Sequence, residues 1–173
     1  MNDVIKNMIE RRSCRAYKPE MIKDEELDLI LKAGEWAPSG MGKQASVLVA
    51  VRDMDTVKKL SDINAKIMGT DGDPFYGAPV VVVVLADTNR PTYVEDGSLI
   101  LENMMLAATS LGIGSCWIHR AKETFESEEG RALMKKWGVP ESYAGVGNVI
   151  LGYPAEPVKQ DKPRKDGRII KIG

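Results

Sequence analysis

The stretch that decides the fold is Asp96–Ile118, which reads DGSLILENMMLAATSLGIGSCWI. Between Leu99 and Leu111 the apolar residues cover most of a helical wheel, and a helix that is apolar nearly all round is typically buried. Two polar residues in its middle argue against a membrane span. Gly112 is the expected left-handed helix stop, and residues 113–118 form a short β-branched and aromatic run. The pattern predicts a central helix, a glycine turn and a strand.

The whole chain has 173 residues, enough for one domain with a sizeable core. Its 24 basic and 25 acidic residues nearly cancel, which gives no electrostatic case for binding nucleic acid or an anionic membrane. The N-terminus lacks the apolar core of a signal peptide. Cys14 and Cys116 are far apart and lack a CxxC motif, which predicts two reduced thiols. We therefore predict a single cytoplasmic domain over residues 1–173.

Periodicity predicts the remaining helices and strands. Helices are expected after Asn2 or Asp3, from an Asp24 cap to near Ala37, from Asp53 or Asp55 through Ile67, and over Ser127–Trp137; strands are expected at Ser46–Arg52, Val80–Ala86 and Gly145–Leu151. The five consecutive valines of the second strand indicate burial on both faces. Two helices come first and the order is not a regular βαβ alternation. We predict an α+β fold, a mostly antiparallel central sheet sandwiched by helices.

Two basic clusters are the strongest indication of a ligand. Arg11, Arg12, Ser13 and Arg15 place three guanidiniums and a hydroxyl just past the end of a helix. Guanidinium groups match phosphate oxygens, so the segment is suited to an anion, although a solvated basic surface is the commoner use of such a run. The second cluster is Lys162–Lys165 in the tail. The clusters would meet on one anionic ligand if the tail packs back; otherwise the tail is a soluble extension.

Three other motifs fail as catalytic signatures. The loop Ser39–Gln44 has one residue between its glycines and no Ser or Thr after its lysine, so it is not a Walker loop. It would still allow close approach to a flat ligand, or be an ordinary connection. Gly112-Ile113-Gly114 follows a helix and precedes a strand, the reverse of a dinucleotide fingerprint. The single histidine, His119, lacks a serine elbow and excludes most histidine-rich metal sites, so we predict no metal.

In this order the segments resemble the nitroreductase family of flavin mononucleotide (FMN) oxidoreductases. The matching segments are RRSCRAY at Arg11–Tyr17, APSGM at Ala37–Met41, LGIGSCWI at Leu111–Ile118, LGYP at Leu151–Pro154 and KPRK at Lys162–Lys165. The resemblance extends over nearly the whole chain. It implies FMN bound at the interface of an intertwined homodimer, with the extended tail 153–173 packed on the partner subunit.

The resemblance also implies which residues contact the cofactor. They are Arg11, Arg12, Ser13, Arg15, Pro38, Ser39, Gly40, Met41, Gln44, Asn64, Trp117, Ile118, His119, Lys162 and Arg164. The first basic cluster would hold the phosphate, ribityl chain and pyrimidine edge, and the tail cluster would approach the same phosphate. The loop 38–44 would come from the other subunit. The backbone of 117–119 would lie against the isoalloxazine, and Asn64 would reach the flavin edge.

Some positions depart from the family pattern. Gly42 stands where the family loop commonly has Asn, and Ala45-Ser46 replaces Pro-Trp. His119-Arg120 replaces the Glu-Gly or Gly-Gly of well-known members, so substrate preferences are not implied by the resemblance. The chain also lacks the helical insertion that closes the pocket in larger members.

The implied activity is ping-pong transfer of two electrons from NAD(P)H to a small acceptor, such as a nitroaromatic or a quinone. The chemistry takes place at the flavin N5, so the chain needs no catalytic side chain of its own. Alternatives are another reaction on the same fold, either dehalogenation or dehydrogenation, and a flavin-binding dimer without turnover. A cofactor-free interaction domain is the third.

Overall fold

The computed structural model describes residues 1–158 and 163–173. Within them the helices are α1 Asp3–Glu10, α2 Asp24–Glu35, α3 Met54–Met68, α4 Tyr93–Ser110, α5 Ala121–Glu126 and α6 Glu128–Lys136, with a 3₁₀ turn, η1, at Gly40–Gly42. The strands are β1 Ser46–Val51, β2 Val80–Asp87, β3 Gly114–Ile118 and β4 Tyr143–Gly152. No helix of this described part is long and apolar enough to cross a membrane.

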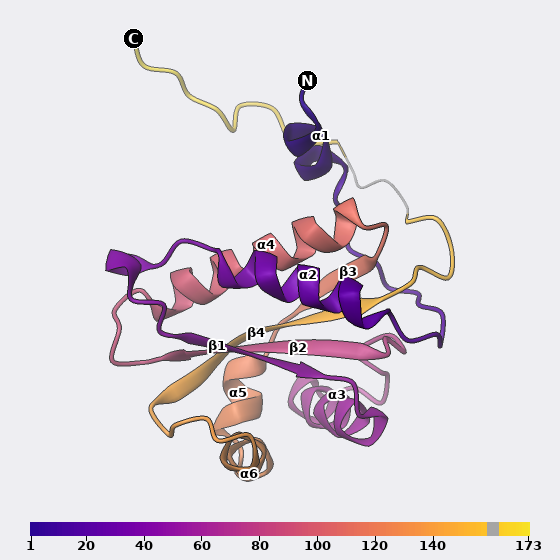
Figure 1. The fold of residues 1–173 in the computed structure, drawn as a ribbon, viewed down its shortest axis with the longest axis vertical. Coiled ribbons are helices and arrows are strands. Elements are labelled where there is room, and N and C mark those ends of the chain that lie inside the picture. The colour runs from indigo at the N-terminus through magenta and orange to yellow at the C-terminus, as the bar shows by residue number, and fades with distance from the viewer. Residues whose placement is uncertain (159–162) are drawn as a thin grey trace.

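The four strands form one sheet in the order β1-β2-β4-β3, with every neighbouring pair antiparallel. Helices α2 and α4 cover one face, and α3, α5 and α6 cover the other (Figure 1). The valine strand β2 lies at the centre, and its residues Val80–Ala86 are fully buried, because alternate side chains enter the core on each face. The predicted α+β sandwich with an antiparallel sheet is confirmed.

Helix α4 is confirmed, but it begins at Tyr93, before the apolar run. It ends at Ser110, and Gly112 takes the expected left-handed conformation with φ of 72°. The prediction that this helix is buried on nearly all of its surface is wrong for one side of the helix, because Leu99 remains 44% exposed in a single chain. On the opposite side a Cβ on Gly34 would be 2.8 Å from Met104 Cγ, so this glycine lets α2 and α4 pack closely.

Two helix predictions need correction. Lys23, not Asp24, is the N-cap of α2, because the Glu26 side chain accepts a hydrogen bond from the Lys23 backbone N–H at 3.0 Å. The same helix ends at Glu35 instead of near Ala37. The short helix α5 was not predicted at all, since its six residues carry no side-chain cap. Its position depends on tertiary packing, because Phe125 is buried in the hydrophobic core between the sheet and helices α3, α5 and α6.

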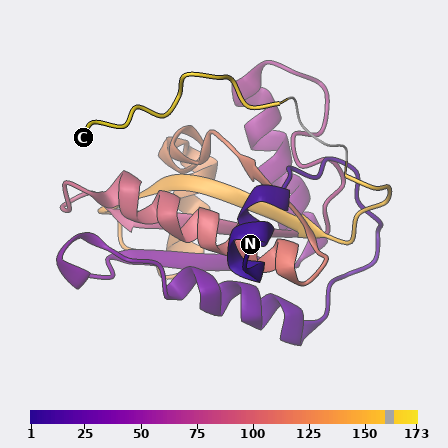
Figure 2. The same ribbon diagram turned by 90° about the horizontal axis from the view of Figure 1, so that it is seen from above.

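The two ends of the chain leave apolar surface uncovered. Helix α1 packs on α4 near the C-terminal end of that helix (Figure 2), where Asn7 Nδ2 donates to Leu106 O at 2.9 Å. Its apolar residues are nevertheless exposed, as are those of the tail: Val4, Ile5, Met8, Ile9, Ile169, Ile170 and Ile172. Residues 163–173 extend beyond α1, away from the sheet (Figure 1), whereas residues 153–155 pair with residues 16–18.

Candidate functional site

The first basic segment, residues 11–15, lies along the outer edge of β3. Ser13 forms an isolated parallel bridge with Ser115, and Cys14 N donates to Ser115 O at 2.9 Å. A Cβ on Gly114 would be 2.8 Å from Cys14 Sγ, so glycine is needed for this close approach. Gly114 is the first residue of β3, within the run 113–118 that was predicted as a strand.

Beyond this bridge the edge of β3 offers unpaired backbone groups. Because the Ser115 carbonyl points away from β4, the backbone groups of Trp117, two residues further on, point the same way. Within the described residues, the Ser13–Ser115 bridge is the only strand pairing on this edge. The edge at Trp117 is thus available to hydrogen bond a ligand.

A cavity of about 380 Å³ opens beside this edge, and we call it the Arg15 cavity. Its lining residues are Arg15, Met68, Thr70, Gly72, Asp73, Pro74, Tyr76, Cys116, Trp117, Ile118, His119 and Arg120. The side chain of Arg15 has no hydrogen-bond or ion-pair partner among the residues that the structure describes. The cavity therefore combines an uncommitted guanidinium with an open strand edge.

Two buried asparagines fix the turn that follows β3. Asn64 Nδ2, on α3, donates to His119 O at 2.7 Å, and Asn148 Nδ2, on β4, donates to Ile118 O at 3.4 Å. Asn64 is completely buried and Asn148 is 2% exposed, and in the described part of the chain neither Oδ1 has a partner. The amide of Asn64 thus positions the cavity wall; its contact with a flavin edge stays a prediction. Asn148 was missed, because no local pattern marks it.

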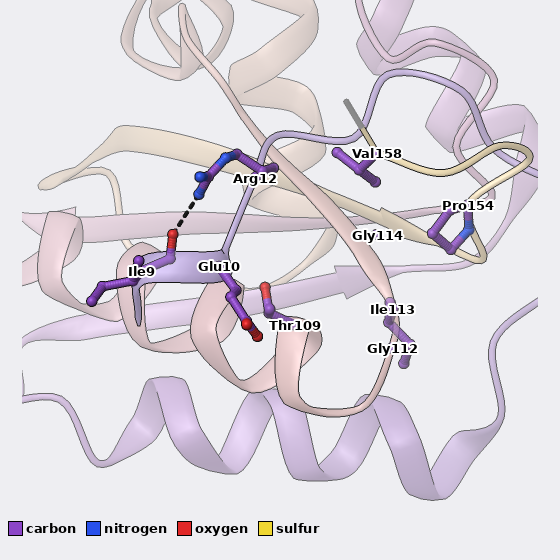
Figure 3. Close-up of a pocket in the computed structure, with 9 residues that line it drawn as sticks. All are labelled: Ile9, Glu10, Arg12, Thr109, Gly112, Ile113, Gly114, Pro154 and Val158. Carbon is purple, nitrogen blue, oxygen red and sulfur yellow. Dashed lines mark hydrogen bonds between the residues drawn. The ribbon is translucent and has the colours of Figure 1, made fainter. Parts of the chain in front are cut away.

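A second cavity, of about 470 Å³, lies between the end of α1, the turn after α4 and residues 154–158 (Figure 3). Arg12 lines it, and Arg12 Nη1 donates to Ile9 O at 2.6 Å and Arg11 O at 2.8 Å, closing the end of α1. Arg11 Nε lies 3.8 Å from Glu102 Oε1 on α4. The structure therefore separates the three arginines, with Arg15 at one cavity and Arg12 at the other.

The loop 38–44 lies at the opposite end of α4 from residues 11–15 (Figure 1). Gly40 N donates to Asp96 Oδ1 at 2.9 Å, and Gln44 N donates to Ser39 Oγ at 3.0 Å. Met41 is 90% exposed. Within one chain the loop, with Pro38 at its start, is not brought to the Arg15 cavity. The prediction missed Asp96, a buried acid directly before the apolar run of α4.

Of the predicted tail contacts, only that of Arg164 falls on described residues, and Arg164 makes no hydrogen bond or ion pair with any of them. Arg164 is exposed in the single chain, and Lys162 lies outside the described residues. Both roles stay predictions about an assembly of two chains.

Two ionisable groups behind the bridge, Cys116 and Tyr17, have raised pKa values. Cys14 and Cys116 form no disulfide, in agreement with the predicted free thiols, and both are buried, which was not predicted. Burial raises the pKa of Cys116, and the Ser13 hydrogen bond and nearby arginines offset only part of this effect. Burial likewise raises the pKa of Tyr17, whose hydroxyl donates to Cys14 O at 2.8 Å. Because their pKa values are raised, the thiol of Cys116 and the phenol of Tyr17 stay protonated near pH 7 and support the wall of the site.

The comparison with known families agrees with this geometry. The model of the Nitroreductase family matches residues 8–153, which include the basic segment, the loop 38–44 and all four strands. The chain belongs to the nitroreductase family. That match ends before the tail, so it leaves the second basic cluster untested.

Two solved structures are similar to this nitroreductase-family chain over its whole length. A nitroreductase with bound FMN from Bacteroides fragilis has 34% identity and a TM-score of 0.92, and each chain covers 100% of the other. A nitroreductase with bound FMN from Desulfitobacterium hafniense has 31% identity, a TM-score of 0.89 and the same coverage. A relative in Bacillus subtilis named FMN reductase (NAD(P)H) is 27% identical over 187 residues, covering 95% of this chain and 70% of its own length.

Proposed function

We propose that this chain is an FMN-dependent oxidoreductase that transfers two electrons from NAD(P)H to a small acceptor, a nitroaromatic or a quinone, by a ping-pong mechanism. Its family membership and the FMN held by its structural relatives support the class of reaction. FMN, when bound, supplies the hydride and electron chemistry, so the protein contributes binding, orientation and electrostatics.

The main observation behind the proposal is that Arg15 and the open edge of β3 line the same cavity. A flavin pyrimidine ring presents N–H and carbonyl groups along one edge, which suits the backbone groups at Trp117. Arg15 would stabilise negative charge on that edge, because its guanidinium is always protonated. The residues present therefore fit the isoalloxazine end of FMN.

The phosphate end needs more donors than one cavity supplies. Arg12 lines the second cavity, Arg11 and Ser13 are its neighbours in the chain, and Arg164 and Lys162 would add charge from the tail. We propose that the complete site forms in a homodimer, with loop 38–44 and the tail coming from the partner subunit. The exposed apolar residues on α1 and the tail support such an assembly.

The test is a steady-state assay with the FMN-loaded protein, varying NADPH or NADH against menadione and against 4-nitrobenzamide. A ping-pong mechanism predicts parallel double-reciprocal lines, because the nucleotide leaves before the acceptor binds. Intersecting lines would contradict the mechanism while leaving the activity in place. Bound FMN without nucleotide oxidation would contradict the activity, and would favour dehalogenation, dehydrogenation or simple flavin binding.

A further inference from the structure

Arg120 is held in a backbone conformation that its side chain disfavours. It follows β3, has φ of 73° and ψ of 17°, and is the N-cap of α5. This left-handed region strains any residue with a Cβ and is relaxed for glycine. Strain of this kind persists where the surrounding structure imposes it, and an observed outlier is a reason to look for a function.

The surrounding structure imposes this turn without using the Arg120 side chain. The carbonyls of the two preceding residues accept hydrogen bonds from Asn64 and Asn148, and the Arg120 carbonyl accepts one from Thr124 N at 2.9 Å. The Arg120 guanidinium itself makes no hydrogen bond or ion pair with any described residue. A glycine would satisfy the fold equally well, so folding does not explain an arginine here.

The side chains around the Arg15 cavity make it electropositive. Arg15 and Arg120 line it, and Asp73 is the only carboxylate among its described lining residues. Both carboxylate oxygens of Asp73 already accept hydrogen bonds, from α3 and from the 73–77 turn. They accept hydrogen bonds from Ser61 Oγ, from the backbone N–H of residue 75 at 2.8 Å and from that of residue 77 at 2.6 Å. Among the described residues, Asp73 forms no ion pair with either arginine.

We propose that Arg120 is a specificity-determining residue that binds an anionic group, carboxylate or phosphate, on the substrate entering the Arg15 cavity. The inference rests on the proposed function, since Arg15 would serve the cofactor and leave Arg120 for the substrate. A guanidinium recognises planar or tetrahedral oxyanions with two parallel hydrogen bonds. The anion has two sources: a carboxylate on the electron acceptor, or the additional ribose phosphate that distinguishes NADPH from NADH.

The test compares the wild type with Arg120→Gly on matched charged and neutral substrates. We use 4-nitrobenzoate against 4-nitrobenzamide as acceptors, and NADPH against NADH as donors. Losing a charge-assisted contact should raise KM about 10-fold for the charged member of one pair, and change the neutral member less than about twofold. A rise for 4-nitrobenzoate assigns the acceptor, and a rise for NADPH assigns the nucleotide. Equal changes in both members of each pair, or no change in any, would overturn the proposal.

Two controls separate charge recognition from folding. Arg120→Gly should melt no lower than the wild type and retain its FMN, because glycine relieves the backbone strain. Lys122→Gln removes a nearby positive charge on α5 whose amine lies 3.9 Å from Glu126 and does not line the cavity. This variant should keep the charged-to-neutral KM ratios of the wild type; a change like that of Arg120→Gly would mean a general field effect and would refute a specific contact.

A binding measurement keeps the inference testable if turnover fails. Calorimetric titration of the FMN-loaded protein with 4-nitrobenzoate and 4-nitrobenzamide needs no electron transfer. Preferential binding of the anion by the wild type, lost in Arg120→Gly, would support the role of Arg120 even if no nucleotide were oxidised. Equal affinity for the two compounds in the wild type, together with a NADPH-to-NADH preference unaffected by the substitution, would refute it.

Discussion

At Gly114 a Cβ atom would lie 2.8 Å from Cys14 Sγ and 2.9 Å from Cys14 Cβ. Gly114→Ala should therefore push residues 11–15 away from β3, lowering the free energy of unfolding by about 1–3 kcal/mol. It should also weaken FMN binding, because the shifted segment carries Arg15. Urea unfolding and fluorescence titration of the apoprotein with FMN measure the two effects.

Gly138→Ala is the matched control for this substitution. Gly138 has φ of 71° and no atom within 4 Å of its Cβ position, so alanine adds backbone strain without displacing a neighbour. The control should lose about 1 kcal/mol of stability and bind FMN normally. Normal FMN affinity in Gly114→Ala as well would show that the approach of the basic segment to β3 does not shape the flavin site.

The raised pKa of Cys116 leads us to predict that the free energy of unfolding depends on pH in the alkaline range. Its pKa is raised, chiefly by burial, so the folded state holds the thiol proton more tightly than the unfolded state does. This contribution is fully present below the unfolded thiol pKa of about 8.5 and is lost as the pH rises through the higher folded value. The free energy of unfolding should fall above about pH 8.5, and less steeply in Cys116→Ala. Identical pH profiles would contradict burial of this thiol.

At the scale of elements, Asp96 connects the start of α4 to the loop 38–44. Asp96→Ala removes the acceptor of the Gly40 N–H and should loosen η1, so trypsin should cleave faster after Lys43. Glu95→Ala is the control, because Glu95 is an exposed acid in the same first turn and has the same favourable effect on the helix dipole. Equal cleavage rates in both variants would mean that the Asp96 contact does not hold the loop.

The elements that the sequence predicted are those with strong local patterns. The pattern that predicts the valine strand β2, and the one that predicts the apolar helix α4, each lie within one continuous stretch of sequence. Periodicity and composition were therefore sufficient to predict both elements. Helix α5 was missed because it is short and held by packing. The apposition of residues 11–15 with β3 was also not predictable from local patterns, because it depends on contacts about 100 residues apart in sequence. The same is true of the amide of Asn148, which reaches the turn after β3 from another strand.

At the scale of the molecule, the exposed apolar tail predicts a second subunit. Ile169, Ile170 and Ile172 are 81%, 82% and 93% exposed in the single chain, which is unfavourable unless a partner covers them. Replacing all three by serine should weaken the dimer, measured by sedimentation equilibrium across a dilution series. Lys171→Ser, in the same stretch, should have little effect. A dimer of unchanged affinity in the triple variant would contradict packing of the tail on the partner.

The proposed function depends on one property above all, a flavin that this chain binds and NAD(P)H reduces. The direct measurement is the visible absorption spectrum of the purified protein, recorded before and after adding NADH or NADPH without oxygen. We predict a flavin spectrum that bleaches with at least one nucleotide. A flavin spectrum that persists would contradict the nucleotide half of the reaction, and no flavin even after reconstitution with FMN would contradict the site itself.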